Sequence, residues 1–177
     1  MRIIAGTAKG TRLAAVPRGT RPLSDRAREG LFSSLGEQVV GARVLDLFAG
    51  TGAMALEALS RGAASATLVD SSPDAVRTIR ENLTRTGLQG EAVRLDAIRF
   101  LSRPIEGFDL VLLDPPWRHP ETVVRDVLEA LEPHLASGAT VAITRPRRAS
   151  TDVIPVNLQV VKHLDYGETR ILVLEAR

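Results

Sequence analysis

One short string, LVLLDPPW at residues 110–117, places several chemically useful groups at a single point of the chain. An apolar run ends in Asp114, which is followed directly by Pro115, Pro116 and Trp117. The prolines stiffen the backbone and remove two N–H donors, so a carboxylate, rigid carbonyl acceptors and an aromatic ring remain. This set suits methylation of an exocyclic amine on an aromatic base, because acceptors on its N–H groups favour the attacking form of the nitrogen.

Each member of this string has an expected role in that reaction. Asp114 and the Pro115 carbonyl would accept the two N–H groups, and Trp117, the only tryptophan of the chain, would stack on the base. A base in a duplex has to leave the stack before its amine can react, whereas a base in a loop is already accessible. A turn that ends a strand beside a core tryptophan is the alternative interpretation.

A glycine-rich turn joins a strand pattern to a helix pattern within VLDLFAGTGAMALEAL at residues 44–59. Gly50 and Gly52 would let the backbone approach a ligand above the helix N-terminus. The string fits G-x-G-x-x-A, and Asp70 lies 18 residues beyond Gly52 at the end of the next strand, where it can bind a ribose diol. A dinucleotide, S-adenosyl-L-methionine and a plain tight turn all fit these features.

Three acidic residues favour S-adenosyl-L-methionine as the cofactor. Asp46, just before the glycine turn, would repel a pyrophosphate but suits the ammonium group of a methionine moiety. Asp70 is expected to hold the ribose and Asp96 the adenine amine, since strand ends of a doubly wound sheet face one crevice; a helix N-cap is the alternative role for Asp96. The expected cofactor residues are Asp46, Phe48, Ala49, Gly50, Thr51, Gly52, Asp70, Ser71, Asp96, Ala97 and Asp114.

Short apolar runs alternate with helical patterns from residue 43 onward, which predicts an α/β fold with a mostly parallel, doubly wound sheet. The last two runs, 158–164 and 169–176, are joined by a turn too short for a crossover helix, so we expect an antiparallel C-terminal hairpin. Ser24 is expected to cap the helix that follows it. Residues 2–5 and 11–16 are expected to form an N-terminal β-hairpin.

The 177 residues indicate one catalytic domain at 23–177 with a small extension at 1–22. Residues 1–30 hold seven basic and two acidic side chains, a local charge of +5 that suggests an anionic partner such as nucleic acid. Arginine makes up 21 of the 23 basic residues, so a GC-rich genome is the alternative explanation. The residues expected to contact RNA phosphates are Lys9, Arg12, Arg21, Arg26 and Arg28.

Composition excludes several other classes of protein. The chain has no cysteine, so thiol nucleophiles, disulfides and iron–sulfur clusters are ruled out. It also lacks an apolar stretch long enough to span a bilayer and a secretory signal, so we expect a cytoplasmic protein with no membrane partner. The expected chemistry requires no metal, and a monomer is the default assembly.

The FAGTG turn, the strand-end acids and DPPW resemble those of class I S-adenosylmethionine-dependent amino-methyltransferases. The N-terminal RIIAGTAKGTRL and RPLSDRAREGLFSSL are similar to the RsmD-type 16S ribosomal RNA (guanine-N2)-methyltransferases, and the resemblance runs through nearly the whole chain. It implies a seven-stranded fold and methyl transfer to N2 of one guanine in an assembling or assembled small ribosomal subunit, with S-adenosyl-L-homocysteine as product. By this match residues 114–117 hold the guanine, Arg21, Arg26 and Arg28 form the family's arginine-rich segment, and Tyr166-Gly167 its late turn.

The sequence leaves the identity of the base open. The family more often has Phe or Tyr at the position of Trp117, and DPPW also occurs among adenine-N6 methyltransferases. One alternative is therefore an adenine-N6 methyltransferase acting on RNA or DNA. Two others are a nicotinamide-dependent oxidoreductase, which would use the glycine turn, and a non-enzymatic RNA-binding assembly factor. His119 has no assigned role, and Arg145, Arg147 and Arg148 either extend an RNA surface or form a solvated loop.

Overall fold

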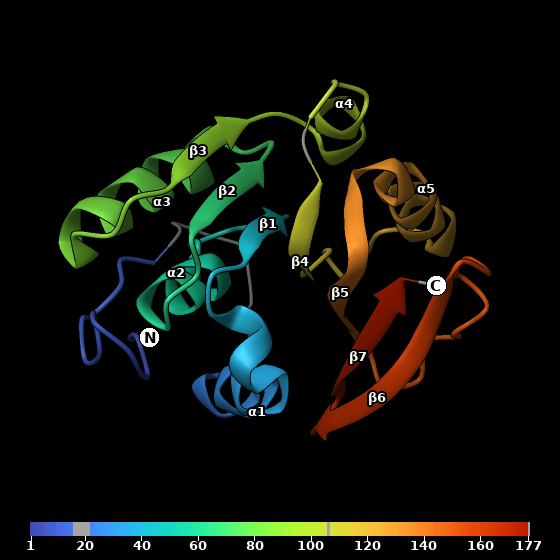
Figure 1. The fold of residues 1–177 in the computed structure, drawn as a ribbon, viewed down its shortest axis with the longest axis horizontal. Coiled ribbons are helices and arrows are strands. Elements are labelled where there is room, and N and C mark those ends of the chain that lie inside the picture. The colour runs from blue at the N-terminus through green and yellow to red at the C-terminus, as the bar shows by residue number, and fades with distance from the viewer. Residues whose placement is uncertain (16–21, 106, 177) are drawn as a thin grey trace.

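A computed structural model describes residues 1–15, 22–105 and 107–176 of the chain. The described part alternates strands and helices as the sequence predicts (Figure 1). In chain order the elements are α1 (Asp25–Leu35), the 3-10 helix η1 (Gly36–Val39), β1 (Arg43–Leu47), α2 (Ala53–Ser60), β2 (Ser65–Asp70), α3 (Pro73–Thr86), β3 (Glu91–Arg94), α4 (Ala97–Leu101), β4 (Phe108–Leu113), α5 (Glu121–Leu131), the 3-10 helix η2 (Glu132–His134), β5 (Leu135–Pro146), β6 (Leu158–Tyr166) and β7 (Thr169–Ala176).

The strands form one seven-stranded sheet in the order β3-β2-β1-β4-β5-β7-β6. The first five strands pair in parallel, while β7 is antiparallel to both β5 and β6. The prediction of a parallel sheet closed by an antiparallel C-terminal hairpin is confirmed. In such a sheet the carboxyl ends of the parallel strands meet at one edge, where ligands bind.

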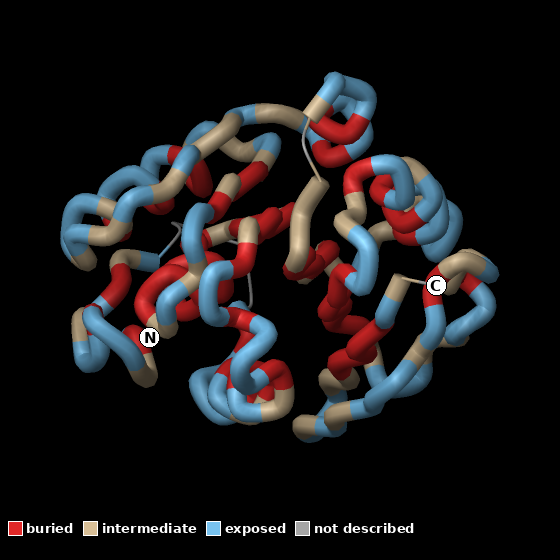
Figure 2. The backbone as a smooth tube through the Cα atoms, viewed as in Figure 1, coloured by how far each residue is buried: buried red, intermediate tan, exposed pale blue. Residues whose placement is uncertain are grey.

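Helices cover both faces of the sheet, which gives three layers. Val44 and Leu112 point to the face packed by α1, α2 and α3. Leu45 and Leu113 point to the opposite face, which α4 and α5 cover. The central strands are therefore buried on both sides over most of their length, and Figure 2 shows their carboxyl-terminal parts as buried.

Local sequence signals explain where two of the helices begin. The Ser24 hydroxyl accepts a hydrogen bond from the Ala27 N–H at 3.2 Å, which confirms the predicted cap of α1. Ser72 caps α3 in the same way, at 3.3 Å from the Ala75 nitrogen, and Pro73 occupies the first helical position. Each cap satisfies a backbone N–H that has no partner within the first turn of its helix.

The N-terminal segment, residues 1–15, does not form the expected pair of strands. Its two arms nevertheless pair irregularly: an isolated antiparallel bridge joins Arg2 and Arg12, the Ile3 N–H donates to the Thr11 carbonyl at 3.0 Å, and the Leu13 N–H donates to the Met1 carbonyl at 3.2 Å. The segment also bonds to α2 and α3: the Ile4 N–H donates to Glu57 and the Ala14 N–H donates to Asn82. Side chains of the domain thus anchor an irregular hairpin that lacks regular strands; residues 16–21 of the predicted extension lie outside the described residues.

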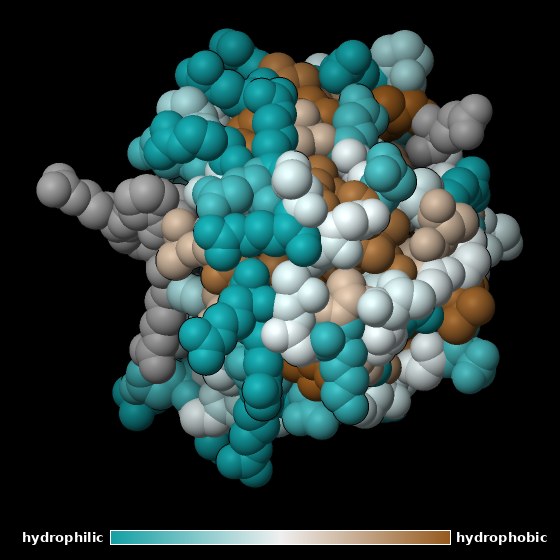
Figure 3. Space-filling view, turned by 90° about the vertical axis from the view of Figure 1, so that its left-hand side faces the viewer, coloured by the Kyte–Doolittle hydropathy of each residue, from teal (hydrophilic) through white to brown (hydrophobic). Residues whose placement is uncertain are grey.

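The surface beside α3 and the N-terminal segment is largely hydrophilic, with apolar side chains between the polar ones (Figure 3). Exposed Arg77, Arg80 and Arg85 on α3 account for part of this character. Within the described part of the chain, no helix has the length and apolarity needed to cross a bilayer.

Candidate active site

Three of the predicted acidic residues meet at the carboxyl edge of the sheet. Asp46 lies in β1, Asp70 ends β2 and Asp114 follows β4, and their charges are close enough to interact. Asp96 lies one strand further out, beyond the end of β3. The sheet order therefore places the glycine turn between Asp70 on one side and the DPPW turn (residues 114–117) on the other.

Asp46 is fully buried beneath the glycine turn. Its Oδ2 accepts a hydrogen bond from the Ala55 N–H at 3.1 Å, whereas Oδ1 has no partner among the described residues. Burial raises the pKa of Asp46 well above its ordinary value, and the nearby charges of Asp114 and Asp70 raise it further. The orphaned oxygen marks a place where an N–H donor or a cation would be stabilised.

A first prediction concerns the stability of the protein without ligand. Asp46→Asn keeps an oxygen for the Ala55 N–H and removes the buried charge, so the midpoint of thermal unfolding at pH 8 should rise by about 2–4 °C, the equivalent of roughly 1 kcal/mol at this chain length. Because the folded-state pKa of Asp46 is raised, its destabilisation is present at high pH and is lost as pH falls through that pKa. Calorimetry that found no gain at pH 8, or a gain that grew on acidification, would contradict this account.

The glycine turn is built from residues with left-handed backbone conformations. Phe48, Gly50 and Gly52 have φ values of 61°, 57° and 78°. A Cβ on Gly52 would lie 2.8 Å from Cδ2 of Leu68, so this glycine is needed for packing of α2 against the sheet. A Cβ on Gly50 would meet nothing closer than 4.0 Å, so the turn has an open side at Gly50 where a ligand can approach the backbone.

Asp70 holds the glycine turn in place. Its Oδ2 accepts the Gly50 N–H and its Oδ1 accepts the Ser72 N–H, both at 2.9 Å. Each carboxylate oxygen retains a further lone pair for the expected ribose contact, and the neighbouring Ser71 is exposed. Asp70 therefore serves the turn even before any ligand is considered.

Asp96 takes the alternative role that the sequence allowed, as the N-cap of α4. Its Oδ1 accepts hydrogen bonds from the N–H groups of Ile98 at 3.0 Å and Arg99 at 3.3 Å. Asp96 is exposed, while Ala97 beside it is buried. The second carboxylate oxygen has no partner among the described residues, so the cap does not occupy the group that the adenine contact requires.

Asn82 and Met1 contact the glycine turn although sequence reasoning did not select them. The Asn82 amide donates to the Thr51 carbonyl at 2.9 Å and also bonds both backbone groups of Ala14. The Thr51 hydroxyl lies 3.7 Å from the Met1 sulfur. An asparagine within a helix pattern gives no sequence signal of this bridge, because its partners lie 31 and 68 residues away.

Asp114 is held at the edge of the sheet by its neighbours. Its N–H donates to the Leu47 carbonyl at 3.5 Å, and Oδ1 accepts a short hydrogen bond from the Thr144 hydroxyl of β5. Burial raises the pKa of Asp114, and the Thr144 hydrogen bond lowers it by a smaller amount. The carboxylate is thus oriented by a buried threonine that the sequence alone did not identify.

The rest of the DPPW turn presents the groups expected to bind a base. Pro115 is buried and its carbonyl accepts no hydrogen bond from the described residues, whereas the Pro116 carbonyl accepts the His119 N–H at 2.9 Å. Trp117 is 44% exposed, so it is not the core tryptophan of the alternative interpretation. A free carbonyl and an exposed ring therefore accompany the Asp114 carboxylate.

His119 joins the DPPW turn to the glycine turn. Its ring packs edge-on against the ring of Phe48, with centroids 5.7 Å apart and planes at 77°. The Nδ1 atom of His119 is buried without a partner among the described residues. Phe48, whose φ of 61° is a backbone conformation that favours glycine, thus contributes its side chain to the contact between the two turns.

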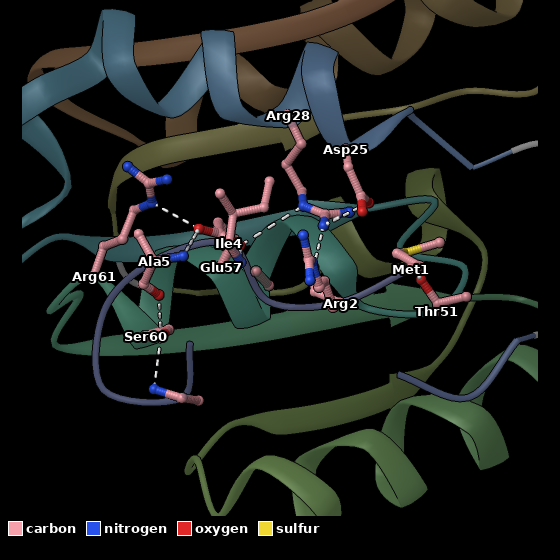
Figure 4. Close-up of polar contacts among 12 residues, drawn as sticks. Met1, Arg2, Ile4, Ala5, Asp25, Arg28, Thr51, Glu57, Ser60 and Arg61 are labelled. Carbon is pink, nitrogen blue, oxygen red and sulfur yellow. Dashed lines mark hydrogen bonds and ion pairs between the residues drawn. The ribbon is translucent and has the colours of Figure 1, made fainter. Parts of the chain in front are cut away.

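The expectation that Arg28 contacts RNA phosphates is wrong. Arg28 is fully buried, and its Nη2 donates to Asp25 at 3.0 Å and to the Arg2 carbonyl, as Figure 4 shows. Its Nε also lies 3.7 Å from the buried Glu57 carboxylate. Two carboxylates and a carbonyl compensate the charge of the buried guanidinium. Because protein encloses the group, no phosphate can reach it.

The other expected phosphate contacts divide into two groups. Lys9, Arg12 and Arg26 are exposed, and Lys9 and Arg26 line one depression of about 340 Å³ between the N-terminal segment and α1. Arg21 lies outside the described residues. Exposure leaves Lys9, Arg12 and Arg26 available to an anionic partner, and their contact with RNA stays a prediction.

The strand order, the glycine turn after β1 and the acidic residues at the strand ends define a Rossmann-like fold of the class I methyltransferase type. A structure of yhhF from Escherichia coli, described as a candidate methyltransferase, superposes with a TM-score of 0.88, 30% identity and coverage of 100% of this chain and 98% of that one. A Thermus thermophilus rRNA methyltransferase structure (TM-score 0.67, 23% identity, 88% of this chain and 44% of that one) shares the fold.

The sequence comparisons give the family. Residues 1–175 match the family described as Conserved hypothetical protein 95, and the chain belongs to that family. Ribosomal RNA small subunit methyltransferase D of Escherichia coli K12 is 34% identical over 161 residues, which are 89% of this chain and 80% of the relative. The protein of the same name from Haemophilus influenzae is 35% identical over 66% of this chain and 64% of its own length.

Proposed function

We propose that this protein transfers a methyl group from S-adenosyl-L-methionine to the exocyclic N2 amine of a guanine in 16S ribosomal RNA. The observation that carries the proposal is the DPPW turn: an oriented carboxylate, an unbonded Pro115 carbonyl and an exposed Trp117 lie together beside a glycine turn with an open side. The relatives named as small subunit rRNA methyltransferases support the RNA substrate. The proposal places the protein in the cytoplasm, acting as a monomer on assembling or assembled small subunits.

The residues at the glycine turn fit S-adenosyl-L-methionine. The unpartnered Oδ1 of Asp46 suits the cofactor's ammonium end, and the open side of Gly50 leaves room for close approach to the backbone. Asp70 and Asp96 would hold the ribose and the adenine amine. When bound, the cofactor supplies an electrophilic methyl group on a positively charged sulfur.

A nicotinamide dinucleotide fits the same edge less well. Asp46, Asp70 and Asp114 concentrate negative charge around the glycine turn, and a pyrophosphate there would meet repulsion from all three. An oxidoreductase would also leave the DPPW turn without a role. The acidic edge thus supports a cationic cofactor.

The chain's own groups account for activation of the amine. The Asp114 carboxylate and the Pro115 carbonyl accept the two N–H groups, which directs the nitrogen lone pair out of the ring plane. Asp114 also stabilises the positive charge that develops on the amine, and its partial burial strengthens that interaction. Trp117 stacks on the base and holds it in line.

Cofactor binding and methyl transfer test the proposal together. Calorimetry should show binding of S-adenosyl-L-homocysteine and none of NAD, and labelled S-adenosyl-L-methionine should transfer its methyl to unmodified 16S rRNA. Binding of NAD alone would favour the oxidoreductase, and binding of neither ligand would favour an RNA-binding assembly factor. Methyl recovered on adenine N6 would keep the fold and the chemistry but change the base.

Thr144 offers a further test of how Asp114 is oriented. Thr144→Val removes the hydroxyl at nearly constant shape, and methyl transfer should slow about 10-fold, since a hydrogen bond to a charged group is worth roughly 1.5–3 kcal/mol. Because that hydrogen bond lowers the pKa of Asp114, the acid limb of the rate profile should move to higher pH. Thr144→Ser should restore both rate and profile.

A second threonine of β5 provides the matched control for that experiment. Thr140 is also buried, four residues before Thr144 in the middle of β5, and its hydroxyl donates to Gln38 at 3.1 Å. Thr140→Val should leave the pH profile unchanged. An identical rate loss in both variants, with no shift of the profile in Thr144→Val, would reduce Thr144 to a packing role.

A further inference from the structure

Basic side chains continue from the DPPW turn along the ends of β5 and the β6–β7 hairpin. We infer that this surface, the arginine path, binds the phosphates of the RNA strand beside the target base through Arg118, Arg148 and Arg26. The inference rests on the proposed function, because it assumes that the anionic partner is RNA. It adds Arg118 to the expected RNA contacts and assigns a phosphate contact to Arg148, whose role the sequence left open between an RNA surface and a solvated loop.

The path begins where β4 and β5 end side by side. The hydrogen bond between Thr144 and Asp114 joins the two strand ends. Arg145, the next residue of β5, donates to Glu121 at 3.2 Å, which ties β5 to the start of α5 just beyond the DPPW turn. Residues 117–121 and 144–148 therefore adjoin, and both lie at the edge where the base would bind.

The path continues from β5 to α1 through the β6–β7 turn. The Arg147 N–H donates to the Glu168 carbonyl at 2.7 Å, which fixes the turn against the end of β5. Tyr166 and Gly167 of this turn share a depression of about 270 Å³ with Ser24 and Arg26 at the start of α1, and β6 and α1 lie side by side in Figure 1. These contacts link the DPPW turn to the start of α1 through the end of β5 and the β6–β7 turn.

The side chains of the path are free to bind an anion. Arg26, Arg118 and Arg148 are exposed, and their guanidinium groups make no ion pair or hydrogen bond within the described part of the chain. Arg145, by contrast, is buried and committed to Glu121. Unpaired arginines beside a catalytic edge suit phosphate, whose geometry the guanidinium matches.

Carboxylates near the path are outnumbered by basic groups. Arg147 and Arg170 both pair with Asp165, at 3.4 and 2.7 Å, so that cluster keeps one positive charge. Asp25 is engaged by Arg28 at 3.0 Å. Glu168 is exposed in the β6–β7 turn and adds one negative charge. With Arg26 and Arg148 included, the net charge of these groups is positive.

Salt-dependent binding of RNA tests the arginine path. The probe is unmodified 16S rRNA made by transcription, bound to the full protein in filter assays between 50 and 300 mM KCl. Arg118→Ala, Arg148→Ala and Arg26→Ala should each weaken binding about fivefold near 0.1 M salt and lower the slope of log affinity against log salt by about 0.7–0.9, the value for one lost phosphate contact. Arg148→Lys should recover most of the slope, because it keeps the charge.

Arg80 on the outer face of α3 gives the matched control. It is exposed and its guanidinium has no ion-pair partner among the described residues, but it lies near the opposite end of the sheet. Arg80→Ala should bind RNA with the affinity and slope of the unaltered protein. Equal losses in Arg80→Ala and Arg148→Ala would overturn the path, since they would reflect net charge alone.

Other readouts separate this inference from the proposed function. The three path variants should bind S-adenosyl-L-homocysteine normally and methylate saturating RNA at the normal rate, with KM for RNA raised about fivefold. Suppose that the unaltered protein methylates RNA, and that Arg118→Ala and Arg148→Ala bind RNA as tightly as the unaltered protein does. The arginine path is then wrong and the proposed function stands. If no RNA is methylated but these variants lose RNA affinity, the path stands and the function is wrong.

Discussion

Asp114→Ala is expected to lower the rate of methyl transfer about 10²–10³-fold, the cost of losing one preorganised electrostatic contact to the reacting group. The variant loses the acceptor for one N–H of the amine and the negative charge beside the developing positive charge. Affinity for S-adenosyl-L-homocysteine should change little, because the cofactor contacts lie mainly at the glycine turn and β2. Single-turnover rates and calorimetry measure the two quantities separately, and an equal loss of both would refute this role for Asp114.

Asp109 provides the control for that experiment. It lies on the same strand, β4, but at the far end, where its carboxylate pairs with Arg43 at 3.0 Å. Asp109→Ala should leave the single-turnover rate within about twofold of that of the unaltered protein. The Asp109–Arg43 ion pair contributes less than roughly 1 kcal/mol to stability and does not contact the reacting group. A large rate loss in this variant would point to a general effect on β4.

The state of Asp114 also predicts the pH dependence of the reaction. Burial raises its pKa above the ordinary value of 3.8, and only the ionised form stabilises positive charge on the amine. The rate should therefore rise with pH through that elevated pKa and then level off. In Asp114→Asn this rise should disappear, because the amide does not titrate; persistence of the same limb would assign it to another group.

Glu57→Ala is expected to have the largest effect on stability. Glu57 is buried in α2, and its carboxylate accepts the N–H groups of Ile4 at 2.8 Å and Ala5 at 3.0 Å and pairs with Arg61 at 2.8 Å (Figure 4). Without the Glu57 carboxylate, the Ile4 and Ala5 N–H groups would have no acceptor, and the buried Arg28 would keep only the Asp25 carboxylate as a partner. Removal of one partner from a buried charge network costs about 3–5 kcal/mol. Since each kcal/mol lowers the midpoint of thermal unfolding by about 2–4 °C at this chain length, the midpoint should fall by about 6–20 °C.

Glu81 supplies the matched control for Glu57. Its carboxylate also pairs with an arginine one helical turn away, Arg85 at 2.5 Å, but both side chains are about half exposed. Glu81→Ala should shift the midpoint by no more than about 2 °C, as expected for a surface pair. Trypsin should also cut the N-terminal segment faster in Glu57→Ala. Equal shifts in the two variants would show that the segment is not anchored through Glu57.

The sequence predicted the sheet well because its signals are local. Apolar runs and their spacing identified every strand, and Ser24 identified the start of α1. The glycine turn and the DPPW turn were placed correctly at one edge, since parallel strands that alternate with helices must end on the same side. Asp46, Asp70 and Asp114 come together for this topological reason.

Side-chain environments set by distant residues were beyond the sequence. Arg28 belongs to an arginine-rich stretch, and only the approach of Glu57 from α2 shows that it is an internal charge and not a phosphate contact. The N-terminal residues have the pattern of two strands, and nothing in that pattern shows that Glu57 and Asn82 anchor them to α2 and α3. In the sequence Thr144 is simply the last residue of an apolar run. Only the pairing of β5 with β4 shows that its hydroxyl donates to Asp114.

The central claim is that the DPPW turn directs a methyl group to the exocyclic amine of guanine. The most direct measurement is to incubate the protein with labelled S-adenosyl-L-methionine and unmodified small-subunit particles or their RNA, digest the RNA to nucleosides and identify the labelled nucleoside by mass spectrometry. We predict N2-methylguanosine, absent when Asp114→Ala is used at the same concentration and time. Label in N6-methyladenosine, or in no nucleoside at all, would contradict the claim.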